Sequence, residues 1–380
     1  MRSLRLLTKV YMIHMMHPIH VVSADSHINE PPSLWIDRVQ ARFRDRAPRI
    51  EHFEQGDAWI IEGALDPINF GSNCSAGLPQ EERKAWIRAD EVREGGYLSA
   101  PRLLDQDRDG VDAEILYPTP RISNSLFWNT GDAEFHVDCI RAYNDWLSEL
   151  CSYAPDRLWG VAMIPNAGVD DAVAEFERAT SLPGMRGAML GQYPHGGELI
   201  DAVDDRLWAA AAEKKVPLAI HVSFATSAQG DKSRSKLTGD MRFFDVPTRI
   251  SQFVSTGVFD RFPELRLALV EVDSGWIPYL REQMDDRFHR GTAQERARLQ
   301  RSPGEYFETN LATTFITDHY GVENRHKVGL TQMMWSSDFP HGGSDWPNSK
   351  ASIDSQLAGV PEHERFLLLA GNALSLYGVS

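Results

Sequence analysis

Cysteine is scarce in this sequence of 380 residues. The three cysteines, Cys74, Cys139 and Cys151, are widely spaced and include no CxxC pair. Disulfide scaffolds use larger, even sets of cysteines, and thiolate zinc clusters use closely spaced ones, so neither class of protein fits. Few cysteines are typical of a reducing compartment, and we therefore expect a cytoplasmic location.

Long apolar runs and an excess of basic residues are also missing. No stretch approaches the roughly 20 apolar residues that a membrane-spanning helix requires, so no membrane partner is expected. Asp and Glu number 54 against 39 Lys and Arg, which gives a formal net charge of −15. Binding to nucleic acid needs clustered basic side chains, so it is not expected either. A small anionic substrate is still allowed, because a local field can oppose the net charge.

Residues 1–19 are interpreted as a leader or tail that precedes the folded part of the chain. They combine basic and apolar residues, as a signal peptide does. Histidines interrupt the apolar part, however, and no small-residue cleavage site follows it. We expect a single domain to span residues 20–380.

Eight short apolar runs alternate with amphipathic segments along this domain. Most runs are continuous rather than alternating, which is typical of parallel strands buried on both faces. The predicted strands are 20–27, 111–118, 158–166, 185–192, 216–223, 265–272, 307–313 and 333–340. The predicted helices are 134–153, 169–180, 204–214, 246–256, 276–290, 353–356 and 362–377. Eight strands with intervening helices predict an α/β fold, a closed (β/α)8 barrel of the TIM type.

Residues 29–104 hold most of the length beyond a minimal barrel. This segment is rich in Pro, Gly, Arg and Trp, and its periodicity is weak. We interpret it as an insertion after the first strand that caps the barrel mouth. Specificity in such barrels resides in loops, so the insertion would help to shape a substrate site.

Four of the predicted strands end in side chains that can bind a metal ion. The first ends in Asp25-Ser26-His27, in which residues two apart face the same side. The fifth ends in His221, the sixth in Glu271, and the eighth runs through Asp338. The carboxyl ends of barrel strands meet at one mouth, so these side chains are predicted to converge. Two imidazoles with several carboxylates suit zinc, manganese or iron better than calcium or magnesium.

Further candidates lie close to the same strand ends. Glu30 could ligate a second ion, or it could turn away and pair with an arginine of the insertion. His341 could also be a ligand, or it could orient Asp338 through a hydrogen bond. The candidate substrate-binding residues are Arg186, His195 and Asn310.

The segments 25–31, 217–221, 275–279 and 337–341 together resemble the amidohydrolase-related family. The most similar branch is that of aminocarboxymuconate semialdehyde decarboxylase and γ-resorcylate decarboxylase, and the resemblance spans roughly residues 20 to 378. It implies a barrel that holds at least one divalent metal ion, with Asp25, His27, His221 and Asp338 as ligands. It also implies that Asp338 contacts the bound water or the substrate, and it favours a homodimer.

The resemblance implies a metal-dependent hydrolase or decarboxylase that acts on a small carboxylated or carbonyl-containing substrate, which could be aromatic. The sequence departs from the decarboxylase pattern at the end of the sixth strand, where those enzymes carry a histidine and this chain has Glu271. Glu271 is therefore a candidate general base or a ligand of a second ion, and Asp338 is the other candidate for moving protons.

Two alternatives stay open. The carboxylate-rich set is large enough for two ions, as in a dinuclear iron or iron–manganese oxygenase on the same scaffold. A non-catalytic partner subunit could also keep the barrel. The near-complete ligand set argues against that second alternative, because a decayed site should lose its ligands first.

Overall fold

The computed structural model describes residues 19–64, 66–128, 131–222, 224 and 238–379. The leader predicted at 1–19 lies outside these residues, apart from its last position. Within the described part of the chain, no helix is both long enough and apolar enough to cross a membrane.

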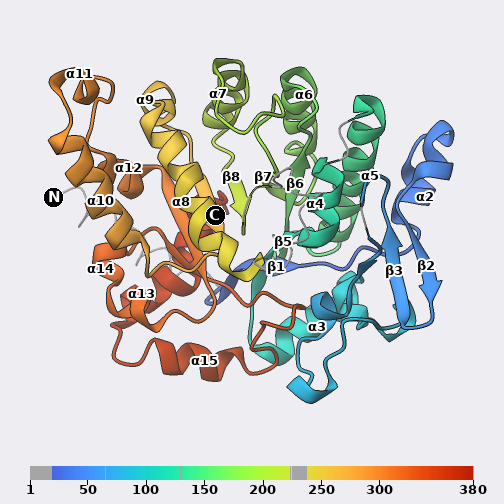
Figure 1. The fold of residues 1–380 in the computed structure, drawn as a ribbon. Coiled ribbons are helices and arrows are strands. Elements are labelled where there is room, and N and C mark those ends of the chain that lie inside the picture. Colours follow the sequence, from blue (N-terminus) through green and yellow to red (C-terminus); the bar gives the residue numbers. More distant parts are fainter. Residues whose placement is uncertain (1–18, 65, 129–130, 223, 225–237, 380) are drawn as a thin grey trace.

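Eight parallel strands form one sheet in the order β1-β5-β6-β7-β8-β9-β10-β11. They are β1 (Val22–His27), β5 (Ala113–Tyr117), β6 (Leu158–Ile164), β7 (Met185–Leu190), β8 (Leu218–His221), β9 (Leu267–Val270), β10 (Leu311–Phe315) and β11 (Met333–Trp335). Nearly every residue of these strands is buried, because helices cover the outside of the sheet and side chains fill its interior. The strands lie at the centre of the molecule with helices around them (Figure 1).

The sheet closes on itself where β1 meets the segment that follows β11. The Asp338 amide donates to the Asp25 carbonyl at 3.0 Å, and the His27 amide donates to the Phe339 carbonyl at 2.7 Å. The Ser337 amide donates to Ser23 Oγ at 2.8 Å on the same seam. These bonds join the first and last strands, and the predicted (β/α)8 barrel is confirmed.

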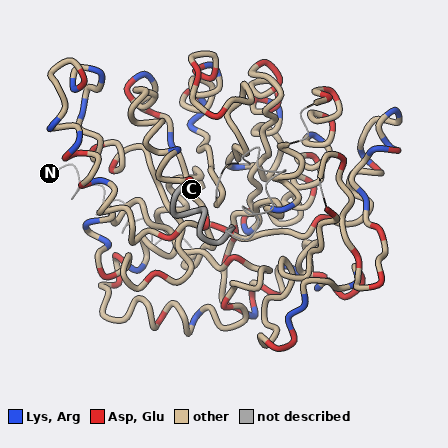
Figure 2. The backbone as a smooth tube through the Cα atoms, viewed as in Figure 1, with Lys and Arg blue, Asp and Glu red and all other residues tan. Residues whose placement is uncertain are grey.

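Each predicted helical range contains helix, but the helix predicted at 246–256 begins at Thr238, and the structure also has helices that were not predicted. The first half of the chain contributes α2 (Leu34–Arg38), α3 (Ser99–Asp109), α4 (Pro120–Trp128), α5 (Ala133–Ser152), α6 (Val169–Ala179) and α7 (Asp205–Lys214). The second half contributes α8 (Thr238–Ser255), α9 (Val258–Arg261), α10 (Ile277–Arg290), α11 (Ala293–Arg296), α12 (Pro303–Thr309), α13 (His319–Glu323), α14 (Arg325–Val328), α15 (Ser349–Gln356), α16 (Glu362–Phe366) and α17 (Asn372–Leu376), with a π-helical turn, Leu367–Gly371, between the last two. Acidic and basic residues are interspersed over these outer helices (Figure 2).

Residues 29–98, called the cap from here on, follow β1, and their described part packs on helix α5 and on the segment after β11. A small antiparallel sheet contains β2 (Arg49–Phe53), β3 (Gly56–Ile60) and β4 (Ile68–Asn69). Short 3₁₀ helices make up much of the rest: Ala41–Arg46, Gly71–Cys74, Gln80–Glu82, Ala89–Glu91 and Glu94–Gly96. The Asn29 amide donates to the Gly96 carbonyl, and the Ala76 amide donates to the Pro340 carbonyl. The cap is therefore tied to the rim of the barrel.

The predicted strand 307–313 is partly wrong. Residues 303–309 form helix α12, and the strand, β10, begins at Leu311. Pro303 occupies the first turn, and Ser302 and Glu305 form a reciprocal capping box that satisfies the free amides there. These start signals outweigh the local apolar run, because Phe307 is buried as well on a helix as on a strand.

Arg102 of α3 connects the cap to the barrel from a buried position, with 2% of its surface exposed. Its guanidinium pairs with Glu114 of β5, with Nε at 2.6 Å from Oε2 and Nη2 at 3.1 Å from Oε1. Nη1 also donates to the carbonyls of His27 at 2.8 Å and Gly95 at 3.2 Å, and Nη2 donates to the Phe339 carbonyl at 3.3 Å. One side chain thus bonds both to the end of β1, at His27, and to the segment that follows β11, at Phe339.

Replacing Arg102 with methionine should destabilise the fold by roughly 3–5 kcal/mol, because Glu114 then stays buried without its cation. The double variant Arg102→Met/Glu114→Met should recover part of this loss, since no uncompensated charge remains. Urea unfolding followed by tryptophan fluorescence measures both. A single variant that unfolds within about 1 kcal/mol of the wild type would contradict this role.

Candidate metal centre

Five ionisable side chains meet at the mouth of the barrel. Asp25 and His27 come from the end of β1, and His221 is the last residue of β8. Glu271 follows β9 directly, and Asp338 lies on the segment after β11. Asp25 and His27 are fully buried, whereas the Glu271 side chain is 19% exposed. We call these five residues the metal cluster.

The facing atoms of the metal cluster lie within a few ångströms of each other. His27 Nε2 is 3.1 Å from His221 Nε2, 3.5 Å from Asp25 Oδ1 and 3.4 Å from Asp338 Oδ1. His221 Nε2 is 3.4 Å from Asp25 Oδ1 and 3.6 Å from Glu271 Oε2. The predicted convergence of strand ends is therefore present in the structure.

The hydrogen bonds of His27 fix its tautomer. Nδ1 lies 3.0 Å from the Pro118 carbonyl, which can only accept, so this nitrogen carries the proton. Burial lowers the pKa of His27 well below its ordinary value and keeps the ring neutral. Its Nε2 lone pair therefore points into the metal cluster, in the arrangement that metal-ligating histidines use.

The metal cluster has the chemistry of a cation site. Neither carboxylate oxygen of the buried Asp25 has a hydrogen-bond partner among the described residues. Burial alone would lower the pKa of His221, but Asp25 and the other carboxylates outweigh that effect and raise it. Burial would likewise raise the pKa of Asp25, yet the imidazoles, His221 first, hold it below its ordinary value. Two imidazole nitrogens and three carboxylates fit a divalent zinc, manganese or iron ion.

Two of the carboxylates stand on strained backbone. Glu271 and Asp338 have φ values of 58° and 54°, in the left-handed region that side chains other than glycine rarely adopt. Glu271 is held there by its amide, which donates to Thr314 Oγ1 at 2.8 Å. Asp338 is held by the bond from its amide to the Asp25 carbonyl. Strain of this kind, on the order of 1–3 kcal/mol per residue, is characteristic of functional sites.

His341 contacts the metal cluster through Asp338 and not as a free ligand. Its Nδ1 lies 2.7 Å from Asp338 Oδ1, and its Nε2 lies 3.2 Å from Nδ2 of the Asn73 side chain. Burial lowers the pKa of His341 to about 3, so the ring is neutral, with Nδ1–H as donor and Nε2 as acceptor. Both ring nitrogens are then engaged, which suits a residue that orients Asp338.

The described residues include two overlapping groups of potential ligands. One contains Asp25, His27, His221 and Glu271, and the other contains His27, Glu271, Asp338 and His341. Both groups need His27, which has a single nitrogen facing the cluster, and the second needs His341 to give up a hydrogen bond. The geometry therefore offers a full set of donors to one ion.

The other predicted site residues lie outside the metal cluster. Glu30 is buried, and its Oε1 accepts a hydrogen bond from the Thr119 amide at 3.0 Å. No arginine pairs with Glu30 in the described part of the chain, so the predicted pairing is not found. His195 follows β7 on the mouth side and bonds through Nδ1 to the buried Asp204 carboxylate at 2.8 Å.

The structure does not bring Arg186 or Asn310 to the mouth. Arg186 is the second residue of β7, about 13 Å along the strand from its carboxyl end. Asn310 precedes β10, and its Nδ2 donates to the carbonyls of Pro263 and Leu265 at the opposite end of the barrel. Both positions correct the predicted substrate contacts, because parallel strands place their amino ends away from the mouth.

Several supporting residues escaped the sequence analysis. Asn73, Thr314 and Arg102 act through bonds to His341, to the Glu271 amide and to the His27 carbonyl. Each is separated by more than 40 residues from the group it contacts, and none carries a local motif.

Replacing His221 with alanine should weaken metal binding by at least roughly tenfold, because it removes one of two ring nitrogens from the cluster. Metal content after dialysis, measured by plasma mass spectrometry, tests this. His195→Ala is the matched control and should keep wild-type metal content. Circular dichroism confirms folding of both variants, and full metal content in folded His221→Ala would refute the ligand assignment.

Characterised relatives of this chain include two lyases. The γ-resorcylate decarboxylase of Rhizobium sp. strain MTP-10005 is 24% identical over 301 residues, which cover 71% of this chain and 87% of that protein. The 2-keto-4-carboxy-3-hexenedioate hydratase of Sphingobium sp. strain NBRC 103272 is 28% identical over 201 residues, or 51% of this chain and 56% of that protein. The predicted resemblance to the γ-resorcylate decarboxylase branch is confirmed.

A solved structure shares the fold. The 5-carboxyvanillate decarboxylase of Novosphingobium aromaticivorans, in a complex with manganese and 4-hydroxy-3-methoxy-5-nitrobenzoic acid, superposes with a TM-score of 0.70. The two are 16% identical, and the match covers 95% of this chain and 97% of that one. A family model described as amidohydrolase matches residues 80–379, a range that holds His221, Glu271 and Asp338. The chain therefore belongs to the amidohydrolase family.

Proposed function

We propose that this chain is a metal-dependent carboxy-lyase that releases CO₂ from a small aromatic carboxylate. The observation that carries the proposal is the convergence of Asp25, His27, His221 and Asp338, with His27 Nε2 within 3.5 Å of an atom of each of the other three. Such a set can hold one divalent ion at the mouth of a barrel, where substrates of this fold bind.

The relatives support a lyase over a hydrolase. The relatives named above catalyse decarboxylation or hydration, and neither reaction is a hydrolysis. The substrates in the decarboxylase names, γ-resorcylate and 5-carboxyvanillate, are aromatic carboxylates. The manganese in the solved complex agrees with the mixed imidazole and carboxylate donors of the metal cluster.

The residues of the metal cluster divide into holding and proton-moving roles. Asp25, His27, His221 and Asp338 would hold the ion, which when bound supplies a Lewis acid that polarises a substrate oxygen. His341 lies against Asp338, with its Nδ1 at 2.7 Å from Oδ1, and helps to position it. The charge of a bound ion would offset the repulsion between the buried carboxylates and an anionic substrate.

Glu271 is the proposed proton donor. In the reaction the bond between the ring carbon and the carboxylate carbon breaks, and its electron pair stays on the ring carbon. That carbon takes a proton from the Glu271 carboxyl group, and CO₂ leaves. The Glu271 side chain is 19% exposed, so water can return the proton. It replaces the histidine that carries this position in the resembling decarboxylases, and a carboxylic acid can do the same proton transfer.

Manganese-loaded protein should release CO₂ from one or more hydroxybenzoates, beginning with γ-resorcylate and 5-carboxyvanillate, in amounts equal to the substrate lost. A coupled CO₂ assay and an oxygen electrode measure the two outcomes together. The corresponding phenols without a carboxylate are the matched control. Oxygen uptake coupled to product, with bound iron, would instead identify the dinuclear oxygenase, and no CO₂ from any aromatic carboxylate would refute the proposal.

Replacing Glu271 with glutamine should lower kcat by roughly 10²- to 10⁴-fold while metal content stays at the wild-type level, because the amide cannot donate a proton to carbon. Metal analysis and initial rates separate the two effects. Glu282→Gln, on the exposed face of α10, is the control and should keep both. If Glu271→Gln lost half of its metal, Glu271 would be a ligand of a second ion and not the proton donor.

A further inference from the structure

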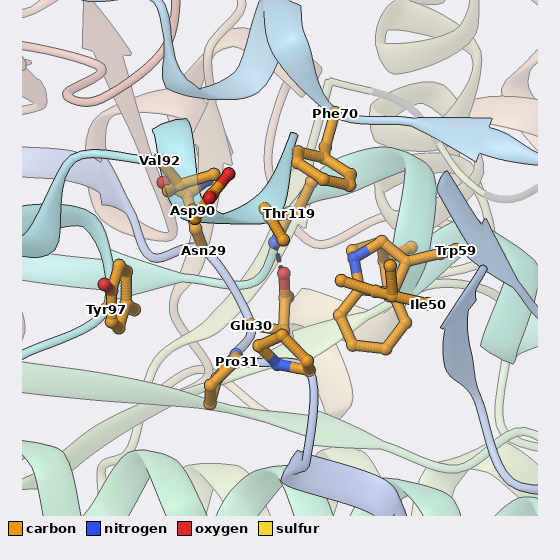
Figure 3. Close-up of a pocket in the computed structure, with 13 residues that line it drawn as sticks. Asn29, Glu30, Pro31, Ile50, Trp59, Phe70, Asp90, Val92, Tyr97 and Thr119 are labelled. Carbon is orange, nitrogen blue, oxygen red and sulfur yellow. Dashed lines mark hydrogen bonds between the residues drawn. The ribbon is translucent and has the colours of Figure 1, made fainter. Parts of the chain in front are cut away.

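A cavity of about 340 Å³ lies between the cap and the barrel rim. Its walls are largely apolar and include Ile50, Trp59, Phe70, Val92, Tyr97 and Ile122. Figure 3 shows Glu30 among these side chains, with its carboxyl group directed toward Thr119 and the Trp59 and Phe70 rings nearby. The volume and the mixture of apolar walls with a few polar groups are typical of a small-molecule site.

The cavity is distinct from the metal cluster. None of the five cluster residues lines it, although Glu30 follows His27 by only three positions. Its charged lining residues are Glu30 and Asp90, and no lysine, arginine or histidine is among the described residues of the wall. An aromatic carboxylate, the proposed substrate, would meet two acids there and no base.

Two acceptor atoms of the lining residues are buried and lack hydrogen-bond partners among the described residues. Asn29 donates through Nδ2 to the Asn73 carbonyl at 3.0 Å, but its Oδ1 has no hydrogen-bond partner among the described residues. Glu30 receives the Thr119 amide on Oε1, and its Oε2 likewise has none. These two residues are 9% and 5% exposed. Buried polar atoms in this state favour a bound group that donates hydrogen bonds.

The charge of Glu30 is also uncompensated. Burial raises its pKa to about 7, and no cationic side chain pairs with it in the described part of the chain. A cation placed beside Glu30 would offset that penalty. The faces of Trp59, Phe70 and Tyr97 attract cations as well, because aromatic rings carry negative charge on their faces.

We propose that this cavity binds a small organic cation, an ammonium group on an apolar body, at Glu30 and Asn29. The ammonium pairs with the Glu30 carboxylate, and the apolar body packs against the aromatic walls. This ligand differs in charge from the proposed substrate, so the site is a second one and not an extension of the metal cluster. The proposal does not depend on the reaction catalysed at that cluster.

Three probes with a common phenyl group and differing charge test the proposal: 2-phenylethylamine, 2-phenylethanol and phenylacetate. Isothermal titration of the metal-loaded full chain should show the amine binding at least roughly tenfold more tightly than the alcohol. Phenylacetate should not compete with the amine. Equal affinities for the amine and the alcohol, or displacement of the amine by phenylacetate, would overturn the proposal.

Two variants and one treatment locate the bound amine. Glu30→Gln keeps an acceptor for the Thr119 amide. It should lower the affinity for the amine at least roughly tenfold, with little change in the affinity for the alcohol. Asp90→Asn, an exposed rim acid, is the matched control and should change amine affinity by no more than about threefold. Removing the metal with a chelator should leave amine binding unchanged. Loss of binding on chelation would place the amine at the metal cluster and refute the second site.

If Glu30→Gln does not fold, the test rests on the wild-type protein and on Asp90→Asn. The ranking of the three probes and the insensitivity to chelation still decide the outcome. Binding of the amine in Asp90→Asn then shows whether the rim acid carries the recognition. A large loss in that variant would contradict the assignment to Glu30.

Discussion

The seam between β1 and β11 is the constraint on which the rest of the structure depends. Asp25 and His27 stand on one side of it and Asp338 on the other, and the backbone bonds between the two sides fix how far apart these ligands are. Arg102 reinforces the seam by donating to the carbonyls of His27 and Phe339 while it pairs with Glu114. Closing the barrel and assembling the metal cluster are therefore the same structural event.

The metal cluster places several carboxylates close together in a buried region. Buried carboxylates at this density repel one another, and they raise the pKa of His221, while the imidazoles hold the pKa of Asp25 below its ordinary value. A divalent ion would offset the repulsion, and the backbone bonds of the seam would hold the ligands in position before the ion binds. The left-handed backbone at Glu271 and Asp338 adds strain that only a well-anchored rim can sustain.

The sequence predicted the barrel and the metal cluster well because both leave local signals. A continuous apolar run that ends in His221 or Glu271 gives a strand, its direction and its rim residue at once. Arg102 gave no such signal, since the carbonyls that it binds, those of His27 and Phe339, come from distant segments. Asn310 does not reach the mouth because the capping box at Ser302 starts a helix there and the strand begins after it, and Arg186 does not because it lies at the amino end of β7.

The metal cluster and the cavity at Glu30 have opposite chemistry, although His27 and Glu30 are only three residues apart in the chain. At His27 the lone pair and the carboxylates would hold a metal ion, whose charge would attract the proposed anionic substrate. At Glu30 the acid lies among aromatic walls, and none of the described lining residues is basic, so that cavity favours a cation. The net charge of −15 therefore predicts neither ligand. The ligand at each site depends on the neighbours of the buried carboxylate. Imidazoles beside it can hold a metal ion, whereas aromatic rings beside it cannot.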